Sequence, residues 1–213
     1  MLRLFVTQAR IQSHRVCALS QTVSVTISVA GERIDAVGAD ARTANGYLGT
    51  DGIKPLAKIC DSDDKGIFVL VKTSNPSSGE LQDMKLETNE SVYEHMGKMC
   101  EGWGEDLMGK HGYSAVGAVV GATYPEQLGE MRAKLPHTFF LVPGYGAQGG
   151  GADDVKNAFD ENGLGAIINS SRGIMCAWKK QGLTEDDFAV AARKEAERMR
   201  DEIVGCIGKI KLG

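Results

Sequence analysis

Apolar runs of five to eight residues recur along the chain and alternate with longer segments in which apolar positions return every three or four residues. The runs are bounded by Gly, Pro, Ser or Asn, which is typical of buried strands. Strands are therefore predicted at residues 66–73, 115–120, 138–142 and 165–169. Helices are predicted at residues 91–108, 125–133, 153–161 and from Thr184 to about Ile207.

The helix predicted at residues 91–108 shows the three-and-four spacing most clearly. Its apolar face is formed by Tyr93, Met96, Met99, Cys100 and Trp103. An earlier unit consists of an apolar segment at 34–44, a turn at 45–49 and a helix that begins near Ile53. Strand, turn and helix thus recur about five times after residue 34, which predicts parallel βα units and an α/β fold.

A glycine-rich turn follows the strand predicted at 138–142. Five glycines lie among the eight residues 144–151. Glycine accepts positive φ values and lets the backbone approach a ligand closely. Because free N–H groups at such a turn also precede the helix predicted from Asp153, the turn is expected to form an anion site.

The next predicted strand ends in a turn that carries an arginine. The run at 165–169 is followed by Ser170, Ser171, Arg172 and Gly173. Together with Gln148 in the glycine-rich turn, this arrangement predicts a phosphate held by backbone N–H groups, an amide and a guanidinium. Two ordinary turns with a surface arginine are the alternative interpretation.

All these distinctive residues lie where a strand ends and its helix begins. In a (β/α)8 barrel that end is the catalytic face, and a phosphate site typically follows the last two strands. A doubly wound sheet would place its phosphate loop after the first strand. The order of the turns therefore favours the barrel. Since a barrel needs about eight strands and some 250 residues, we expect an incomplete barrel made of about its last five βα units.

Residues 1–31 differ from the rest of the chain because they contain no Asp or Glu, but several Arg, Ser and Thr. Organelle transit peptides have this composition, and a wrong reading frame or gene start would also produce it. Alternation at residues 22–29 indicates a strand as a third possibility. We treat 1–31 as an atypical N-terminal segment and 32–213 as the C-terminal portion of a barrel domain.

Composition narrows the class of protein without revealing a mechanism. A hydrophobic content of 42% and a charged content of 24% predict a globular chain, and the net charge of −4 argues against nucleic acid as a partner. No apolar run approaches a membrane span. The five cysteines include no CxxC pair, which suits free thiols and a cytoplasmic location. The four scattered histidines show no metal-binding spacing, so no metal is predicted.

Five segments, in order, resemble the motifs of one family. They are KTSNPSS (72–78) with ELQD (80–83), GAVVGAT (117–123), PGYGAQGG (143–150), NSSRGI (169–174) and the earlier turn NGYLGTD (45–51). This combination is similar to orotidine 5′-phosphate decarboxylase of the bacterial type 2 branch, although proline is more usual there than Gly46. The resemblance covers roughly residues 34–213.

The resemblance implies a homodimeric (β/α)8 barrel, or TIM barrel, that uses no cofactor. The family removes CO2 from orotidine 5′-monophosphate (OMP) to make uridine 5′-monophosphate (UMP), the last step of pyrimidine nucleotide synthesis. The expected partner is therefore a small-molecule nucleotide rather than a nucleic acid or a membrane.

By position in the motifs, the resemblance also implies a set of substrate-binding residues. Ser74 resembles the serine that hydrogen-bonds the pyrimidine, Gln148 the glutamine that spans phosphate and base, and Arg172 the phosphate arginine. Pro143 sits at the start of the phosphate loop, and Gly149 and Gly173 are the expected backbone contributors. For Ser74 the alternative is a helix-entry cap before Pro76.

The proton-transfer part of the family site has no match. Family members carry an Asp-x-Lys-x-x-Asp motif after the third strand, and its lysine is the general acid that protonates the carbanion left by CO2. No such motif precedes the turn at 45–51, and the first lysine of the chain is Lys54. Lys72 alternates onto the same side as Ser74 and is the remaining catalytic candidate. We therefore expect little or no decarboxylation by this chain.

Two other functions remain open. The chain could be a non-catalytic nucleotide- or phosphate-binding barrel remnant, or another phosphate-handling barrel enzyme. Five strands also leave two sheet edges, so we expect an open barrel, a replacement strand from residues 22–29, or pairing with another chain.

Overall fold

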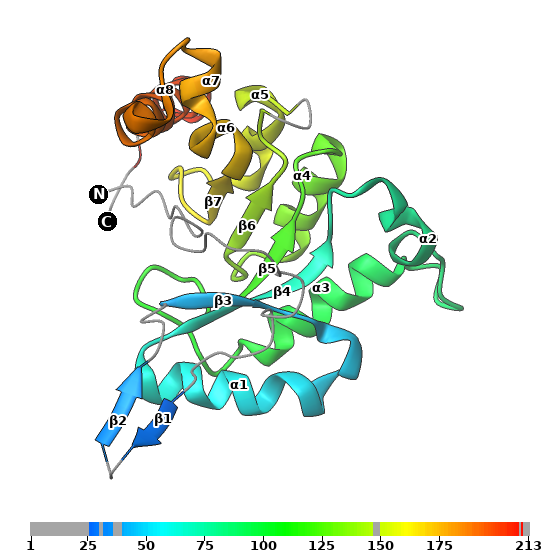
Figure 1. Ribbon diagram of the computed structural model, residues 1–213. Helices are drawn as coiled ribbons and strands as arrows, with labels where there is room; N and C mark the ends of the chain where they lie inside the picture. Colours follow the sequence, from blue (N-terminus) through cyan, green and yellow to red (C-terminus); the bar gives the residue numbers. More distant parts are fainter. Residues whose placement is uncertain (1–25, 30–31, 36–39, 147–149, 209, 211–213) are drawn as a thin grey trace.

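The computed structural model describes residues 26–29, 32–35, 40–146, 150–208 and 210, and its main sheet has five parallel strands in the order β3-β4-β5-β6-β7 (Figure 1). The strands are β3 (Ala41–Ala44), β4 (Gly66–Lys72), β5 (Val116–Val120), β6 (Phe140–Pro143) and β7 (Ala166–Asn169). Neighbours along the chain are neighbours in the sheet, as expected for consecutive βα units. The predicted α/β class and the order of the units are confirmed.

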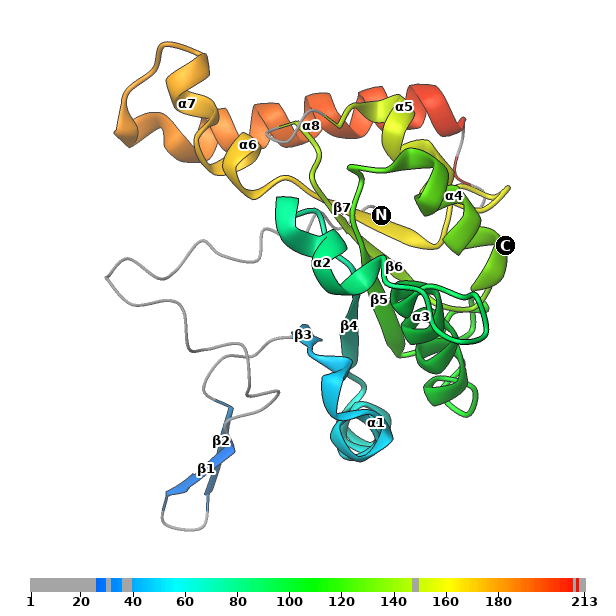
Figure 2. The same cartoon turned by 90° about the vertical axis from the view of Figure 1, so that its right-hand side faces the viewer.

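The sheet is curved, and helices cover its outer face (Figure 2). The longer helices are α1 (Thr50–Asp63), α3 (Val92–Trp103), α4 (Pro125–Lys134) and α8 (Phe188–Ile207). The short helices are α2 (Gly79–Gln82), α5 (Ala152–Val155), α6 (Ser171–Met175) and α7 (Ala177–Lys180). The 3-10 turns are η1 (Gly46–Leu48), η2 (Pro76–Ser78), η3 (Lys156–Ala158) and η4 (Glu185–Asp187).

The hydrophobic core lies between the sheet and these helices. Ile67, Val69 and Val71 alternate along β4 and are buried, whereas Leu70, on the other face, is 38% exposed. Every residue of β5 is buried, as expected for the middle strand of a covered sheet. The helices contribute the buried side chains Ile53, Cys100, Trp103, Leu128, Met131 and Met199. The helix layer therefore fixes the strands and, through them, the turns at their carboxyl ends.

The structure shortens two of the predicted helices. Helix α3 ends at Trp103 rather than Met108, because Gly104 is its C-cap and the chain then turns, with the N–H of Leu107 bonded to the carbonyl of Gly104 at 2.9 Å. Helix α5 ends at Val155 and passes into the 3-10 turn η3, so the helix predicted at 153–161 is also too long. The predicted apolar face of α3 is confirmed, since Tyr93, Cys100 and Trp103 are buried and Met96 and Met99 pack against the core.

A separate pair of strands precedes the main sheet. β1 (Thr26–Val29) and β2 (Glu32–Asp35) pair antiparallel with each other. In the described part of the chain β1 therefore belongs to its own small sheet and adds no strand to the edge of the main one. The strand considered as one possibility for residues 22–29 agrees with β1 over residues 26–29, and residues 22–25 lie outside the described ones.

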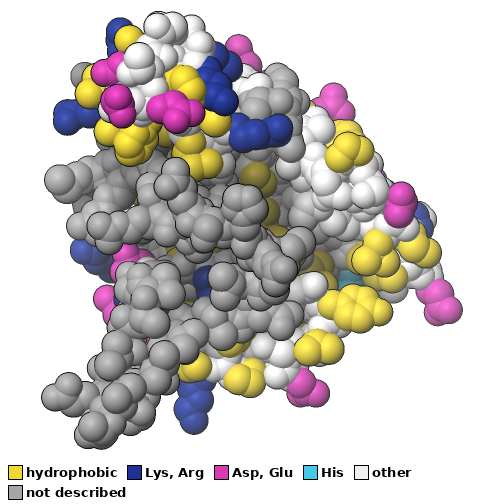
Figure 3. Space-filling model, viewed as in Figure 1, with side chains coloured by type: hydrophobic (Ala, Val, Ile, Leu, Met, Phe, Trp, Pro, Cys, Tyr) yellow, Lys and Arg dark blue, Asp and Glu magenta, His cyan; other side chains and the backbone are white. Residues whose placement is uncertain are grey.

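The surface carries a hydrophobic group around the start of α8 (Figure 3). It consists of Leu183, Phe188 and Val190, with exposed fractions of 40%, 54% and 69%. Among the described residues, no helix combines the length and the apolar character needed to cross a bilayer.

Candidate functional site

A pocket of about 170 Å³ lies at the carboxyl ends of β4, β6 and β7. Its lining residues are Ser74, Pro143, Gly144, Tyr145, Asn169, Ser170, Ser171 and Arg172. The structure thus brings together Ser74, Pro143 and Arg172, which the sequence places in three separate motifs. This is the end of the strands where barrel proteins hold their functional residues.

The glycine-rich turn leaves β6 with the backbone conformations expected of it. Gly144 and Gly146 have φ values of 107° and 77°, which residues with a Cβ rarely adopt. The N–H of Gly146 donates to the carbonyl of Gly150 at 2.7 Å, and the carbonyl of Pro143 accepts from Ala122 at 2.9 Å. The described parts of the turn are therefore tied to each other and to the end of β5.

Tyr145 anchors this turn to the last helix. Its ring is 4% exposed, and its hydroxyl donates to Glu202 of α8 at 2.7 Å. Burial raises the pKa of Tyr145, and the hydrogen bond to the Glu202 carboxylate raises it further, so the phenol stays protonated. The hydroxyl of buried Ser170 donates to the carbonyl of Tyr145 at 2.9 Å and joins the two turns.

Arg172 supplies the positive charge of the pocket. Its side chain is exposed, and within the described residues its guanidinium has no hydrogen-bond or ion-pair partner. Among the described lining residues there is no carboxylate, and hydroxyls of serines accompany the arginine. A free guanidinium beside several hydrogen-bond donors suits an anion with several oxygens, such as a phosphate.

Gly173 is buried in the turn of helix behind Arg172. A Cβ at this position would collide with the Ser170 hydroxyl. The absence of a side chain at Gly173 therefore lets α6 start in close contact with Ser170, whose hydroxyl joins the two turns.

Ser74 lines the pocket from the end of β4. Gly121, at the end of β5, lies so close that a Cβ there would be 3.0 Å from the Cβ of Ser74. The side chain of Ser74 makes none of the cap hydrogen bonds of the following turn η2, which its alternative interpretation as a helix cap would require.

Lys72 lies two residues before Ser74 but is not among the residues that line the pocket. Its side chain is 1% exposed, and its ammonium lies 2.5 Å from the carboxylate of Asp83. The pairing of β4 with β5 shifts register between Leu70 and Lys72, so simple alternation does not hold across this point.

Two expected site residues, Gln148 and Gly149, lie outside the described residues. Five lining residues were not singled out as site residues from the sequence, namely Gly144, Tyr145, Asn169, Ser170 and Ser171. Their signal was their position, because all five stand at the same two strand ends as Pro143 and Arg172.

The five-stranded sheet, its helix layer and this pocket define a protein of the parallel β/α barrel class, with a cationic pocket at the carboxyl ends of the strands. The chain belongs to the orotidine 5′-phosphate decarboxylase / HUMPS family, whose model matches residues 22–182. It is 45% identical over 172 residues to the orotidine 5′-phosphate decarboxylase of Rhodopirellula baltica, covering 79% of this chain and 57% of that protein. The corresponding protein of Caldicellulosiruptor bescii is 46% identical over 168 residues, covering 79% and 54%.

Solved structures agree with the fold. A Toxoplasma gondii protein described as a candidate orotidine-monophosphate-decarboxylase superposes with a TM-score of 0.65 at 30% identity, covering 80% of this chain and 60% of that one. Leishmania donovani OMP decarboxylase superposes with a TM-score of 0.59 at 33% identity, covering 78% and 58%. The chain thus spans 54% to 57% of the length of the two curated relatives compared above, and the predicted partial barrel is confirmed.

Proposed function

We propose that this chain binds OMP and UMP in the pocket at the ends of β4, β6 and β7, and that it serves the decarboxylation of OMP in pyrimidine synthesis. The observation that carries the proposal is the meeting of Ser74 and Arg172 in one pocket. A nucleotide 5′-monophosphate has a phosphate at one end and a hydrogen-bonding base at the other. A guanidinium that follows β7 and a hydroxyl that follows β4, in one pocket, match these two ends.

Each expected binding residue has a role in this proposal. Arg172 binds the phosphate, with backbone groups of the turns that contain Pro143, Gly149 and Gly173. Ser74 hydrogen-bonds the pyrimidine, and Gln148 spans base and phosphate. Contacts to the phosphate lie far from the reacting carbon, so their binding energy is available to the transition state of the reaction.

Decarboxylation also requires a proton donor. Loss of CO2 leaves the bonding electron pair on the pyrimidine ring, and a general acid must protonate this carbanion. The motif that supplies the lysine in the family does not occur before residue 45 of this chain. The 213-residue chain by itself is therefore expected to bind nucleotide and to turn over OMP slowly or not at all.

Calorimetric titration with UMP tests the binding proposal. Arg172→Ala should weaken UMP binding at least tenfold, because a charge-assisted contact to phosphate contributes about 1.5–3 kcal/mol. Arg193→Ala is the matched control, since Arg193 is an exposed arginine of α8 outside the pocket. Folded wild-type protein that fails to bind UMP would refute the proposal, and an absorbance assay with OMP measures turnover separately.

The relationship to the family further supports a homodimer in the cytoplasm. A dimer could cover the sheet edges formed by β3 and β7, which the described strands leave open.

A further inference from the structure

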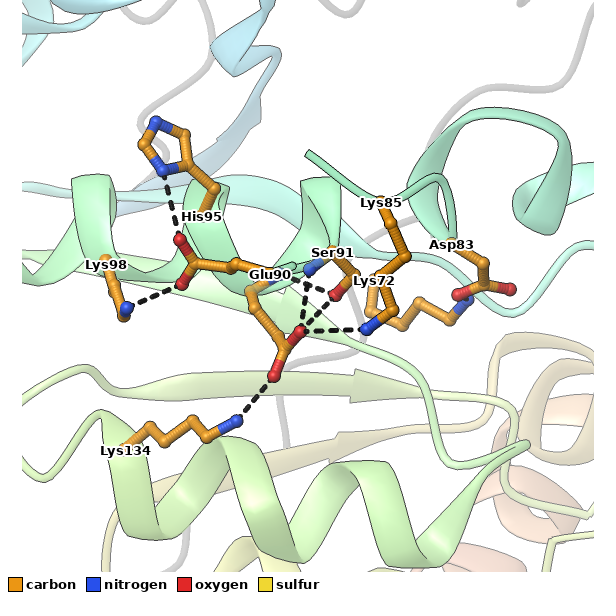
Figure 4. A network of polar contacts seen from close by, with 9 residues as sticks. Lys72, Asp83, Lys85, Glu90, Ser91, His95, Lys98 and Lys134 are labelled. Carbon is orange, nitrogen blue, oxygen red and sulfur yellow. Dashed lines mark hydrogen bonds and ion pairs between the residues drawn. The ribbon is translucent and has the colours of Figure 1, made fainter. Parts of the chain in front are cut away.

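The buried ammonium of Lys72 is held from several sides at the end of β4. Its Nζ atom lies 2.5 Å from Oδ1 of Asp83 (Figure 4). The same atom lies 5.2 Å from the ring centres of both Tyr93 and Tyr124. A buried lysine needs such a partner, because an unpaired ammonium in a hydrophobic core is costly. Since Asp83 directly follows α2, the pair fastens the end of the strand to that short helix.

The neighbouring residue, Thr73, makes a two-way contact with the same helix. Its N–H donates to Oε1 of Gln82 at 2.9 Å, and Nε2 of Gln82 donates to the Thr73 hydroxyl at 2.7 Å. The Thr73 hydroxyl in turn donates to Oδ1 of Asn75 at 2.6 Å. The residues on both sides of Ser74 are therefore connected to each other and to Gln82.

The end of β5 supports Ser74 from a third side. The N–H of Gly121 donates to the carbonyl of Lys72 at 2.8 Å, and the backbone of Gly121 lies against Ser74. A single serine is thus enclosed by contacts that leave its backbone little freedom. None of Lys72, Gln82 and Asp83 lines the pocket, so their effect on a ligand must pass through Ser74.

We propose that Gln82 and Asp83 are positioning residues that hold the end of β4 so that Ser74 is presented to the pyrimidine of the nucleotide. The proposal rests on the proposed nucleotide binding at this pocket. It assigns to α2, an element without a pocket residue, control over recognition of the base. In the described part of the chain, the side chains of Gln82 and Asp83 bond to Thr73 and Lys72, and not to Arg172 or the turn after β6 at the phosphate end of the pocket.

The test compares two ligands on the full-length chain: UMP, and ribose 5-phosphate, which lacks the base. Gln82→Ala and Asp83→Ala should each weaken UMP binding about tenfold, the usual scale of one lost polar contact. Binding of ribose 5-phosphate should change less than about twofold. Asp83→Glu keeps a carboxylate for Lys72 and should restore most of the UMP affinity.

Asp40→Ala is the matched control, because Asp40 pairs with Lys65 at 3.4 Å beside the opposite end of β4 and is 58% exposed. It should leave both affinities unchanged. Wild-type protein that binds neither ligand would overturn the proposed function and this inference with it. The positioning role alone would be overturned in two cases, provided that the wild type binds UMP. In the first case Gln82→Ala and Asp83→Ala bind UMP as well as the wild type does. In the second they lose affinity for UMP and for ribose 5-phosphate alike.

Discussion

At the scale of single residues, the pocket depends on close backbone contacts that leave no space for side-chain atoms. Gly173 is buried next to the hydroxyl of Ser170, which joins the two turns through its bond to Tyr145. An added methyl group must displace either that hydroxyl or the start of α6. Overpacking of this kind typically costs about 1–3 kcal/mol.

Gly173→Ala is therefore expected to lower the free energy of unfolding by about 1–3 kcal/mol in urea titrations. Gly205→Ala is the matched control. A Cβ at Gly205, within α8, would meet nothing within 4 Å. Alanine there should stabilise the helix by about 0.5–1 kcal/mol. Equal and small effects of the two substitutions would contradict the packing argument.

The pattern of strand-end turns pointed to Arg172, whereas Ser74 and Pro143 were singled out only by the resemblance to the family motifs, and all three line the one pocket. Sequence reasoning did not find the partners that hold these turns, such as Glu202, because a long-range hydrogen bond leaves no local pattern. It also could not foresee the environment of Lys72. The register shift in β4 and the distant acceptor Asp83 are properties of the folded chain.

At the scale of elements, helix α3 begins with a reciprocal cap. The hydroxyl of Ser91 accepts from the N–H of Glu94, and the Glu94 carboxylate accepts from the N–H of Ser91 at 2.8 Å. Lys134 of α4 pairs with the same carboxylate at 2.5 Å. The hydrogen bond from Lys134, followed by those from Ser91, lowers the pKa of Glu94 to about 2.

The stabilisation from Glu94 should depend on pH in a defined direction. A carboxyl whose pKa is lower in the folded state stabilises above its unfolded value, about 4.3, and loses that effect as the pH falls. Glu94→Gln should therefore cost about 1 kcal/mol at pH 7. The difference from wild type should shrink from pH 5 to pH 2, measured by chemical unfolding. Glu197→Gln, which breaks an exposed pair with Arg193, serves as a control with little effect at any pH.

Arg132 joins three elements at the amino ends of the strands. Its guanidinium donates to the carbonyls of Leu135, Thr138 and Gly165 and lies 4.2 Å from the ring centre of Phe140. Lysine cannot reproduce this planar fork. Arg132→Lys should therefore destabilise the protein by about 2–3 kcal/mol in urea unfolding.

The same substitution should leave UMP affinity of the folded protein unchanged, because the pocket lies at the other end of the strands. Arg193→Lys is its control, since that side chain is 81% exposed. Loss of UMP binding by folded Arg132→Lys protein would show that the two ends of the sheet are not independent.

The sequence predicted well those elements that are long enough to show a regular spacing of apolar residues. Strands β4 to β7 and the helices α1, α3, α4 and α8 were foreseen, whereas the apolar segment at 34–44 is divided between the end of β2 and β3. Helices α2, α6 and α7 were not, because four or five residues carry no helical repeat. The end of α3 was placed too late because apolar residues continue to Met108 although Gly104 has already stopped the helix.

At the scale of the whole molecule, the described main sheet has β3 and β7 at its two edges. An edge strand presents unpaired backbone N–H and C=O groups to its surroundings. Burial of these edges by a second copy would agree with the homodimer inferred for this chain. The order of the motifs was enough to predict a partial barrel, but no sequence pattern tells what meets its edges.

Sedimentation velocity should therefore show a dimer at micromolar concentration, with a melting temperature that rises as protein concentration increases. The rise follows from mass action, since association stabilises only the folded chains. A single monomeric species, with one melting temperature across all concentrations, would contradict the homodimer.

The hydrogen bond between Tyr145 and Glu202 has a consequence for the evolution and engineering of this chain. Glu202 lies in the second half of the final helix, far along the sequence from the turn that it restrains. Mutations in α8 can therefore alter the turn after β6 without contacting the pocket. If the pocket binds a nucleotide as proposed, a tag or a shortened tail that disturbs the second half of α8 should weaken phosphate binding before it unfolds the protein.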